Sequence, residues 1–296
     1  MPFKWQREVI VTYLIAVDSG HGMETAGKRT PAIPEPWFNK KKGECIHEKE
    51  FNKPAAEYLI TALNRCGFQT VNVSPGTVDV PLTDRFRAAN EAKADLFISK
   101  HYNASTGTWG NANGIETIIS QYAGEDSKKL AVLVQAELVK AHKRTDRGVK
   151  RDIDQSGINI AVLRNTNMPA ILTESGFMDN LTEAKTMLDP VFQKDDGEAT
   201  CKGICNYFGV AYKTETLIPV KGITKTSPRE EIQWLQEKLN AALPGETYIP
   251  LTINGLFDTK TRIAVLMYWE TRGWKQDGKE DGWSVGRGTV EALAKL

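Results

Sequence analysis

The sequence predicts an α/β fold, a mostly parallel sheet flanked by helices, followed by a small all-α domain at the C-terminus. Apolar runs typical of buried strands alternate with amphipathic stretches from residue 13 to residue 210, which favours a parallel sheet. A stretch with little periodicity follows at 213–228, and beyond it only helical periodicity and turn signals remain. The length of 296 residues suits two domains.

The composition is that of an ordinary globular protein. Hydrophobic residues make up 41% and charged residues 25%, which excludes collagen-like, low-complexity and wholly disordered classes. Lys and Arg number 38 against 37 Asp and Glu, so the chain lacks the basic surplus of a nucleic-acid binder, and we expect no such partner. The apolar run at 9–17 is too short to span a bilayer, and the first residues lack a signal-peptide layout. We therefore expect no membrane insertion and no secretion leader.

Six short apolar runs are predicted to be strands. They lie at 13–17, 69–73, 95–101, 114–120, 160–163 and 170–173. Glycines punctuate the end of the first run, and the third ends at a histidine. In parallel sheets, ligands bind beyond the carboxyl ends of the strands. Because His21, His101 and Glu174 each follow an apolar run, we expect them to lie along one edge of the sheet.

Five stretches with helical periodicity connect these strands. They lie at 54–65, 83–93, 127–142, 183–188 and 191–210. In the first of them, apolar residues recur every three or four positions until Gly67 ends the pattern. Thr83 or Asp84 stands near the start of the second, and an apolar stripe runs along the third. The segment 28–46 is a polar loop rich in proline and lysine.

The cysteines are too few for a disulfide scaffold. They are Cys45, Cys66, Cys201 and Cys205. Cys201 and Cys205 are four residues apart in a helical stretch, so they share one face. We expect two reduced, partly buried thiols there rather than a metal or redox pair.

The C-terminal part is predicted to be a linker, 213–228, followed by a small helical domain, 229–296. The linker has little periodicity, and the domain opens with a helical apolar stripe that starts at Ile232. A weak repeat follows. In it, the turns at 254–255 and 281–282 each precede a helix, the first capped at Asp258 or Thr259.

His21, Glu48 and His101 are candidate zinc ligands. Zinc in hydrolases is commonly held by three ligands of histidine and carboxylate type, with one position left for water. The spacing alone is a weak signal, because in a chain with 4 histidines such a set arises easily by chance. The alternative is that both histidines bond within turns and Glu48 is a solvated acid at a helix entry.

Glu174 is the candidate catalytic acid/base. It follows the apolar run PAILT, where an acid is costly unless it is paired or functional. A carboxylate beside a zinc-activated water can take a proton and deliver it to a leaving amine. The alternative is a surface acid just beyond the strand.

Four sequence blocks occur in the order found in one hydrolase family. They are VDSGHG at 17–22, EKEFN at 48–52, SKHYNA at 99–104 and the block 163–177, which ends in ESGF. On these blocks, residues 13–210 resemble the zinc-dependent N-acetylmuramoyl-L-alanine amidases of type 3, which cleave bacterial peptidoglycan. The sequence departs from the family pattern at Ser19, where proline is common, and in the long insert 28–46.

The resemblance implies a site and a reaction. His21, Glu48 and His101 would hold Zn2+, Glu174 would be the catalytic acid/base, and Asn103 would help to bind substrate. His47 could in principle replace Glu48 as a ligand, but the E-K-x-x-N block aligns on Glu48. The implied reaction is hydrolysis of the amide between N-acetylmuramic acid and L-alanine, with bacterial peptidoglycan as the partner.

The second domain is similar to the small helical peptidoglycan-binding modules of wall hydrolases, and a dimerisation or stabilising domain is the alternative. The whole arrangement resembles a bacteriophage endolysin, held in the host cytoplasm until it is released to the cell wall. A sporulation autolysin is the other setting. A zinc peptidase acting within the stem peptide and an inactive wall-binding scaffold are the competing functions.

Overall fold

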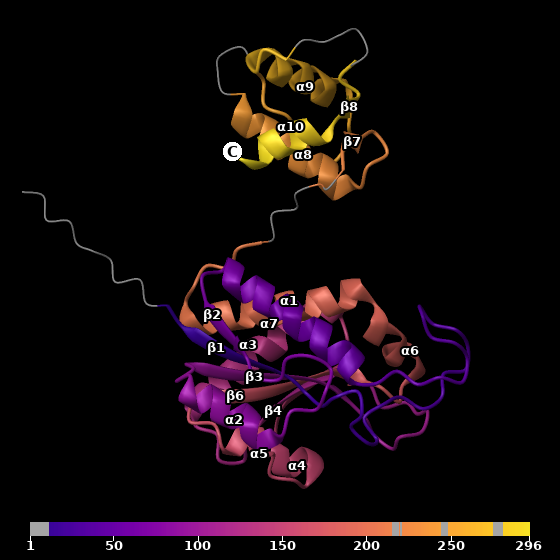
Figure 1. The fold of residues 1–296 in the computed structure, drawn as a ribbon, viewed down its shortest axis with the longest axis vertical. Coiled ribbons are helices and arrows are strands. Elements are labelled where there is room, and N and C mark those ends of the chain that lie inside the picture. Colours follow the sequence, from indigo (N-terminus) through magenta and orange to yellow (C-terminus); the bar gives the residue numbers. More distant parts are fainter. Residues whose placement is uncertain (1–11, 215–218, 220, 244–247, 275–280) are drawn as a thin grey trace, which may run out of the picture. The chain divides into compact units, whose positions relative to one another are not determined.

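The computed structural model describes residues 12–214, 219, 221–243, 248–274 and 281–296. The chain forms two compact units, divided between Thr214 and Glu215, and each is described by itself (Figure 1). Within the described ranges, none of the helices combines the length and the apolar character needed to cross a membrane.

A six-stranded sheet forms the centre of the first unit, with the strand order β2-β1-β3-β6-β4-β5. The strands are β1 (Leu14–Ser19), β2 (Gln69–Asn72), β3 (Leu96–Asn103), β4 (Ile115–Ile119), β5 (Asp146–Arg151) and β6 (Ala170–Phe177). The first four strands in that order run parallel, whereas β4 is antiparallel to β6 and parallel to β5. The predicted mostly parallel sheet is therefore confirmed.

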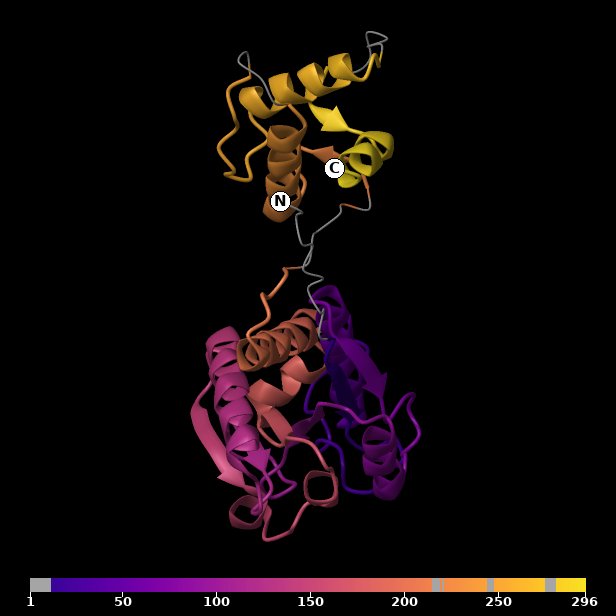
Figure 2. The same cartoon turned by 90° about the vertical axis from the view of Figure 1, so that its left-hand side faces the viewer.

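Helices cover both faces of this sheet (Figures 1 and 2). One face packs on α1 (Lys49–Arg65), α3 (Glu125–His142) and α7 (Pro190–Phe208), and the other on α2 (Leu82–Glu91) and α5 (Ala161–Arg164). Strand side chains alternate between the faces. In β1, Ile15 and Val17 join the first core and Ala16 the second. The same alternation in β3 and β6 directs the side chains of the site.

One predicted strand was wrong, and one strand was not predicted. Residues 160–163 are not a strand, because Ala161–Arg164 forms the short helix α5, whose Val162 and Leu163 pack in the second core. Periodicity cannot separate a strand from a helix in so short an apolar run. Strand β5 was not predicted because its sequence, DRGVKR, is mostly charged, as is common at the edge of a sheet.

Helix α1 begins at Lys49, five residues before the predicted start at Pro54. The prediction rested on the helical apolar spacing, which begins only at Ala55. Inside the helix, Pro54 has no N–H to bond the carbonyl of Glu50. The side chain of Gln193 on α7 donates to that carbonyl instead, over 3.1 Å. The compensating bond comes from a residue far along the chain, so the local sequence could not indicate it.

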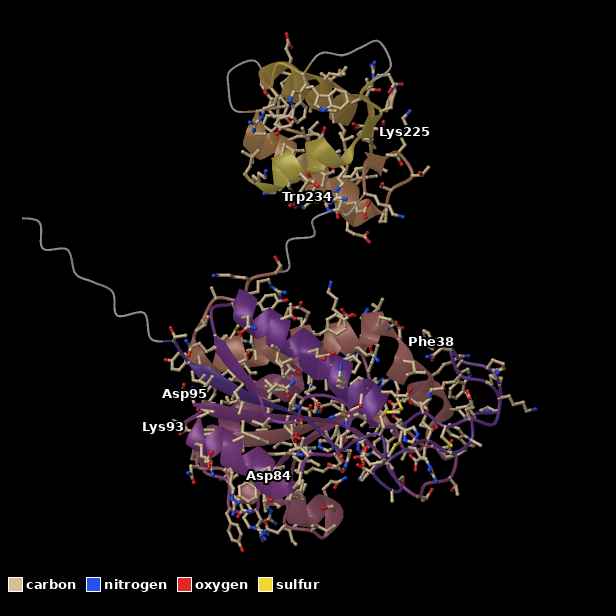
Figure 3. The ribbon with its side chains drawn as sticks, in the orientation of Figure 1. Phe38, Asp84, Lys93, Asp95, Lys225 and Trp234 are labelled. Atoms are coloured by element: carbon tan, nitrogen blue, oxygen red, sulfur yellow. The ribbon has the colours of Figure 1, made fainter. Side chains whose placement is uncertain are left out.

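Short elements complete the first unit. They are α4 (Asp152–Ser156), α6 (Leu181–Ala184) and a 3-10 turn at Lys185–Leu188, so the predicted helix 183–188 is two short pieces. Helix α7 begins at Pro190, where the side chain of Asp189 accepts the N–H of Val191. Asp95, labelled in Figure 3, accepts the N–H of Leu14 over 2.7 Å and fixes the start of β1 beside β3.

The second unit contains three helices and a small antiparallel ladder among its described residues. They are α8 (Arg229–Ala242), α9 (Thr259–Thr271), α10 (Arg287–Ala294), β7 (Ile223–Thr224) and β8 (Ser284–Val285). Gln236 of α8 bonds the backbone N–H groups of Asn254 and Gly255 and so fixes the predicted turn. The predicted linker 213–228 reaches too far, because Ile223 pairs with Val285 and is buried in this core.

Candidate metal centre

The site lies where β1, β3 and β6 end and α1 begins. His21 follows β1, His101 lies near the end of β3, and Glu48 precedes the first residue of α1. One possible ligand atom from each of the three lies within 4.8 Å of the other two. Glu48 Oε2 is 3.4 Å from His21 Nε2, and Glu48 Oε1 is 2.9 Å from His101 Nδ1. Three residues predicted from distant parts of the sequence therefore converge.

The loop that carries His21 is held tightly against its neighbours. A Cβ atom on Gly20 would lie 2.1 Å from the His101 ring, so only glycine allows the two to come this close. His21 itself has φ of 61°, in the left-handed region. The buried Lys49 donates from Nζ to the carbonyl of Ser19 over 2.6 Å and ties the loop to α1.

The Glu48 carboxylate is fixed and ionised. Its Oε1 accepts the backbone N–H of Tyr102 and the side-chain amide of Asn52, each over 3.1 Å. Burial would raise the pKa of Glu48, but His21 and His101 outweigh it and hold that pKa well below its usual range. Burial lowers the pKa of His21 to about 4, against the opposing effect of Glu48. An anionic carboxylate and a neutral imidazole are the forms that bind a metal cation.

A hydrogen-bond relay orients the third residue, His101. Nε2 of His101 lies 3.0 Å from Ser99 Oγ, and Ser99 donates its single hydroxyl proton to Asp18 Oδ2 over 2.6 Å. Ser99 must therefore accept from Nε2–H, and Nδ1 is the ring nitrogen that faces Glu48. Arg85 in turn bonds Asp18 Oδ1 over 3.0 Å. Such outer partners fix the tautomer of metal-binding histidines.

Glu174 occupies the strand next to His101. The two residues are register partners on β6 and β3, and their side chains share the α2 side of the sheet. Glu174 Oε2 is buried without a hydrogen-bond partner among the described residues. Burial, with the charge of Glu48 second, raises the pKa of Glu174 well above its usual value. A carboxyl group poised in this way is suited to proton transfer.

Asn103 lies on the wall of the same cavity but its amide is engaged within the protein. Nδ2 donates to Glu116 Oε1 over 2.7 Å, and Oδ1 accepts the N–H of Ala104 over 2.8 Å. Its role toward substrate stays a prediction. His47, the alternative ligand, does not belong to the group of converging donors.

A cavity of about 980 Å³ opens over these residues. Apolar side chains, Ile118, Ile158 and Leu172 among them, line one part of it. The insert 28–46 contributes Lys28, whose backbone carbonyl accepts the N–H of Glu48 over 2.9 Å. The insert is anchored by a small core in which Ile33, Trp37 and Ile46 pack with residues of α1 and β3, while Phe38 is exposed (Figure 3). The insert is thus part of the wall of the site.

Sequence reasoning missed several residues of this site. Asp18 and Ser99 stand inside the quoted blocks. Their membership of those blocks was the available signal. Arg85 and Lys28 gave no signal, because only the folded chain brings their segments to the strand ends.

The chain is similar to several known proteins, both in sequence and in structure. A family model described as N-acetylmuramoyl-L-alanine amidase matches residues 15–206. The endolysin of Bacillus phage SPP1 is 37% identical over 210 residues, 70% of this chain and 70% of its own. The sporulation-specific N-acetylmuramoyl-L-alanine amidase of Bacillus subtilis is 32% identical over 66% of this chain and 68% of its own. The solved N-acetylmuramoyl-L-alanine amidase of Clostridium difficile 630 is 30% identical, with a TM-score of 0.55, over 67% of this chain and 97% of its own.

Proposed function

The chain belongs to the N-acetylmuramoyl-L-alanine amidase family, and we propose that it performs this hydrolysis with a zinc ion held by His21, Glu48 and His101. The family membership makes it an enzyme that hydrolyses cell-wall peptidoglycan. The bond cleaved joins the lactyl group of N-acetylmuramic acid to L-alanine of the stem peptide. The identity of the metal, the role of each site residue and the biological setting are the proposed parts.

The observation that carries the proposal is the convergence of two imidazoles and one carboxylate within 4.8 Å. This donor set matches the histidine and carboxylate ligands of hydrolytic zinc, which also leave one position for water. The protonation states fit as well, because Glu48 is ionised and His21 is neutral at pH 7. The partnerless Oε2 of Glu174 supplies a proton acceptor beside the set.

When bound, zinc would polarise the scissile carbonyl and lower the pKa of a water molecule towards about 7. Glu174 accepts a proton from the water that attacks the carbonyl carbon. It then delivers the proton to the alanine nitrogen, which leaves as an amine. Ser99 and Asp18 hold the His101 ring in place throughout. No side chain forms a covalent bond to the substrate in this scheme.

A zinc peptidase acting within the stem peptide is the second candidate, because the same donor set can hydrolyse either bond. The family match favours the amidase. The products separate the two, since the amidase creates L-alanine N-termini and a peptidase creates new amino-acid termini further along the stem. An inactive scaffold is disfavoured by the intact donor set and the unpaired Glu174.

For the second unit we propose binding to the cell wall. A cavity of about 320 Å³ lies beside α9, with Asn254, Asp258 and Lys260 in its wall. Since the chain has a net charge of only +1, we expect recognition by shape and hydrogen bonds rather than by a basic field. A fragment that includes Ile223, residues 219–296, should sediment with purified peptidoglycan at low and at physiological salt alike. Loss of binding at physiological salt would contradict this.

For the setting we propose a phage endolysin, because the SPP1 endolysin is more similar than the sporulation amidase, at 37% against 32% identity. Expression in the cytoplasm of a susceptible bacterium tests it. Cells should lyse only after the membrane is opened, by chloroform for example. Lysis without that treatment would contradict release through a membrane opening.

Metal analysis tests the site. The purified protein should contain at least one zinc per chain, and removal of the metal by a chelator should stop the clearing of cell-wall suspensions. His21→Ala should lose one zinc equivalent and its activity. Full activity in the chelated protein would contradict the proposal.

A further inference from the structure

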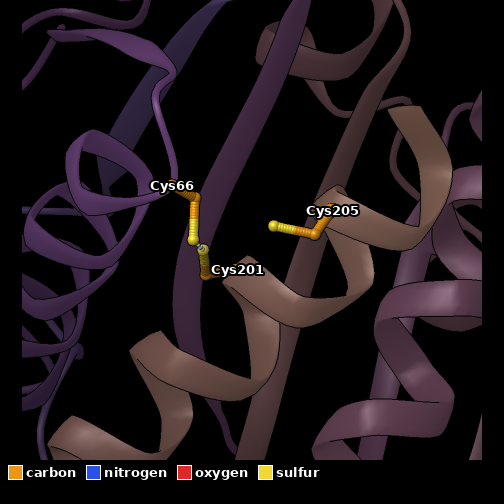
Figure 4. A group of neighbouring side chains, drawn as sticks. All are labelled: Cys66, Cys201 and Cys205. Atoms are coloured by element: carbon orange, nitrogen blue, oxygen red, sulfur yellow. Dashed lines mark hydrogen bonds between the residues drawn. The ribbon is translucent and has the colours of Figure 1, made fainter. Parts of the chain in front are cut away.

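Three of the four cysteines meet in the interior of the first unit. Cys66 lies at the end of α1, and Cys201 and Cys205 are one turn apart on α7 (Figure 4). The sulfur atoms of Cys66 and Cys201 are 3.8 Å apart, and all three sulfurs lie within 4.8 Å of one another. Cys66 and Cys201 are 135 residues apart in the chain. The sequence alone favoured two isolated thiols at Cys201 and Cys205, and the arrival of Cys66 changes that interpretation.

We propose that Cys66, Cys201 and Cys205 form a second metal site, which binds one thiophilic ion such as Zn2+, Cd2+ or Cu+ through three thiolates. This site goes beyond the amidase reaction and is separate from the His21, Glu48 and His101 set. Thiolate sulfur is the ligand that such ions prefer over nitrogen and oxygen.

The spacing of the sulfurs fits such an ion. A Zn–S bond of about 2.3 Å places two sulfurs of a tetrahedral site about 3.8 Å apart. The distance from Cys66 Sγ to Cys201 Sγ has this value, and Cys205 completes a compact triangle. The other two edges of the triangle are no longer than 4.8 Å.

The surroundings can hold the resulting negative charge. Three thiolates around a divalent ion carry one net negative charge, and the backbone N–H of Lys213 already points at Cys66 Sγ over 3.3 Å. The guanidinium of Arg65 donates to the carbonyl of Lys213 over 2.7 Å and is paired with Glu198, so its charge is already balanced. The N–H donor next to Cys66 favours the thiolate form.

Metal binding must displace protons at this site. Burial raises the pKa of Cys66, so without a metal its thiol keeps its proton at pH 7. A divalent ion that binds three thiols forms three metal–sulfur bonds and releases three protons to the buffer. Cys201 and Cys205 are fully buried and Cys66 is 4% exposed, so the ion enters past Cys66 and Lys213. Once bound, it links α1 to α7.

Titration of the full-length, reduced protein, freed of metal by a chelator, with Cd2+ tests the proposal. The readouts are the number of Cd2+ ions bound and the sulfur-to-cadmium charge-transfer absorption, which cadmium on histidine and carboxylate does not produce. Wild type should take up one sulfur-bound Cd2+ per chain and release protons as it does so. Cys45→Ser is the matched control, because Cys45 lies outside the cluster, and it should behave as wild type.

Cys201→Ser and, separately, Cys205→Ala should each lose most of the absorption and the high-affinity equivalent while keeping the circular dichroism of wild type. If one variant fails to fold, the other still tests the proposal. Equal cadmium binding in wild type and both variants would overturn the proposal. So would an absorption that depends on Cys45.

Discussion

Glu116 and Glu174 lie directly opposite each other on strands β4 and β6, yet the pKa values of their carboxyl groups are shifted in opposite directions. Glu116 Oε2 pairs with Arg147 over 2.7 Å and with Lys150 over 2.8 Å. Burial would raise the pKa of Glu116, but these bonds hold it below its usual value, whereas burial and Glu48 raise the pKa of Glu174. Neighbouring acids with diverging pKa values indicate one structural anion and one proton carrier.

Replacing the proton carrier should abolish turnover without disturbing the site. Glu174→Gln keeps the size of the side chain but cannot take a proton from water, so kcat/KM on peptidoglycan should fall by about 10²–10⁴-fold. Zinc content and circular dichroism should match wild type. Glu44→Gln, at an exposed acid of the insert, is the control and should keep full activity. A near wild-type rate for Glu174→Gln would remove Glu174 from the reaction.

The same substitution should stabilise the metal-free protein at neutral pH. Because the pKa of Glu174 is raised above 4.5, the folded protein keeps a proton there after the unfolded chain has lost it. The stability of wild type therefore falls as the pH rises through the window from 4.5 to the raised pKa. Glu174→Gln lacks this loss, so at pH 7 its free energy of unfolding should exceed that of wild type.

Urea unfolding in the presence of a chelator, repeated across pH, measures this difference. The advantage of Glu174→Gln should shrink as the pH falls and vanish below 4.5. A constant difference at every pH would mean that Glu174 does not titrate in this window.

The relay behind His101 should govern zinc affinity. Ser99→Ala removes the acceptor of Nε2–H, so the ring loses its fixed tautomer and orientation, and zinc affinity should fall by about 10–100-fold. Competition with a chromogenic chelator measures it. Ser105→Ala, at an exposed serine on the cavity wall, is the matched control. Unchanged affinity in Ser99→Ala would show that the relay does not hold the ligand.

A buried ion pair between Lys100 and Asp196 should affect the stability of the fold through the balance of its two charges. Lys100 Nζ lies 2.7 Å from Asp196 Oδ1, and both side chains are fully buried. Asp196→Asn leaves the lysine unpaired and should cost about 3–5 kcal/mol of unfolding free energy. The double variant Lys100→Met, Asp196→Leu removes both charges and should recover most of that loss. Equal destabilisation by the single and double changes, measured in urea, would contradict this account.

The sequence could predict those parts of the fold that rest on local patterns. Apolar runs located five of the six strands of the sheet, the edge strand β2 among them. The shared carboxyl ends of the parallel strands anticipated that His21, His101 and Glu174 would meet. Residues 160–163 were wrongly predicted to be a strand, because a four-residue apolar run is too short for its periodicity to separate strand from helix. Strand β5 was missed because the charges of its edge position hide the pattern.

What the sequence could not predict depends on contacts between distant segments. The start of α1 rests on Gln193, and the orientation of His101 on Asp18. Lys28 reaches the cavity only because the insert pairs with the segment before α1, where Thr30 N–H bonds the carbonyl of Ile46 over 2.9 Å. No local periodicity encodes such pairings. The long insert could be noticed in the sequence, but its place in the wall of the site could not.

The central claim is that a metal held by His21, Glu48 and His101 lets this chain cleave the amide between N-acetylmuramic acid and L-alanine. Mass analysis of purified peptidoglycan digested by the zinc-loaded protein tests it most directly, with chelated wild type and Glu174→Gln as controls. The account predicts free L-alanine N-termini and glycan strands stripped of peptide, with neither product in the controls. New termini within the stem peptide, or the same products from the chelated protein, would contradict it.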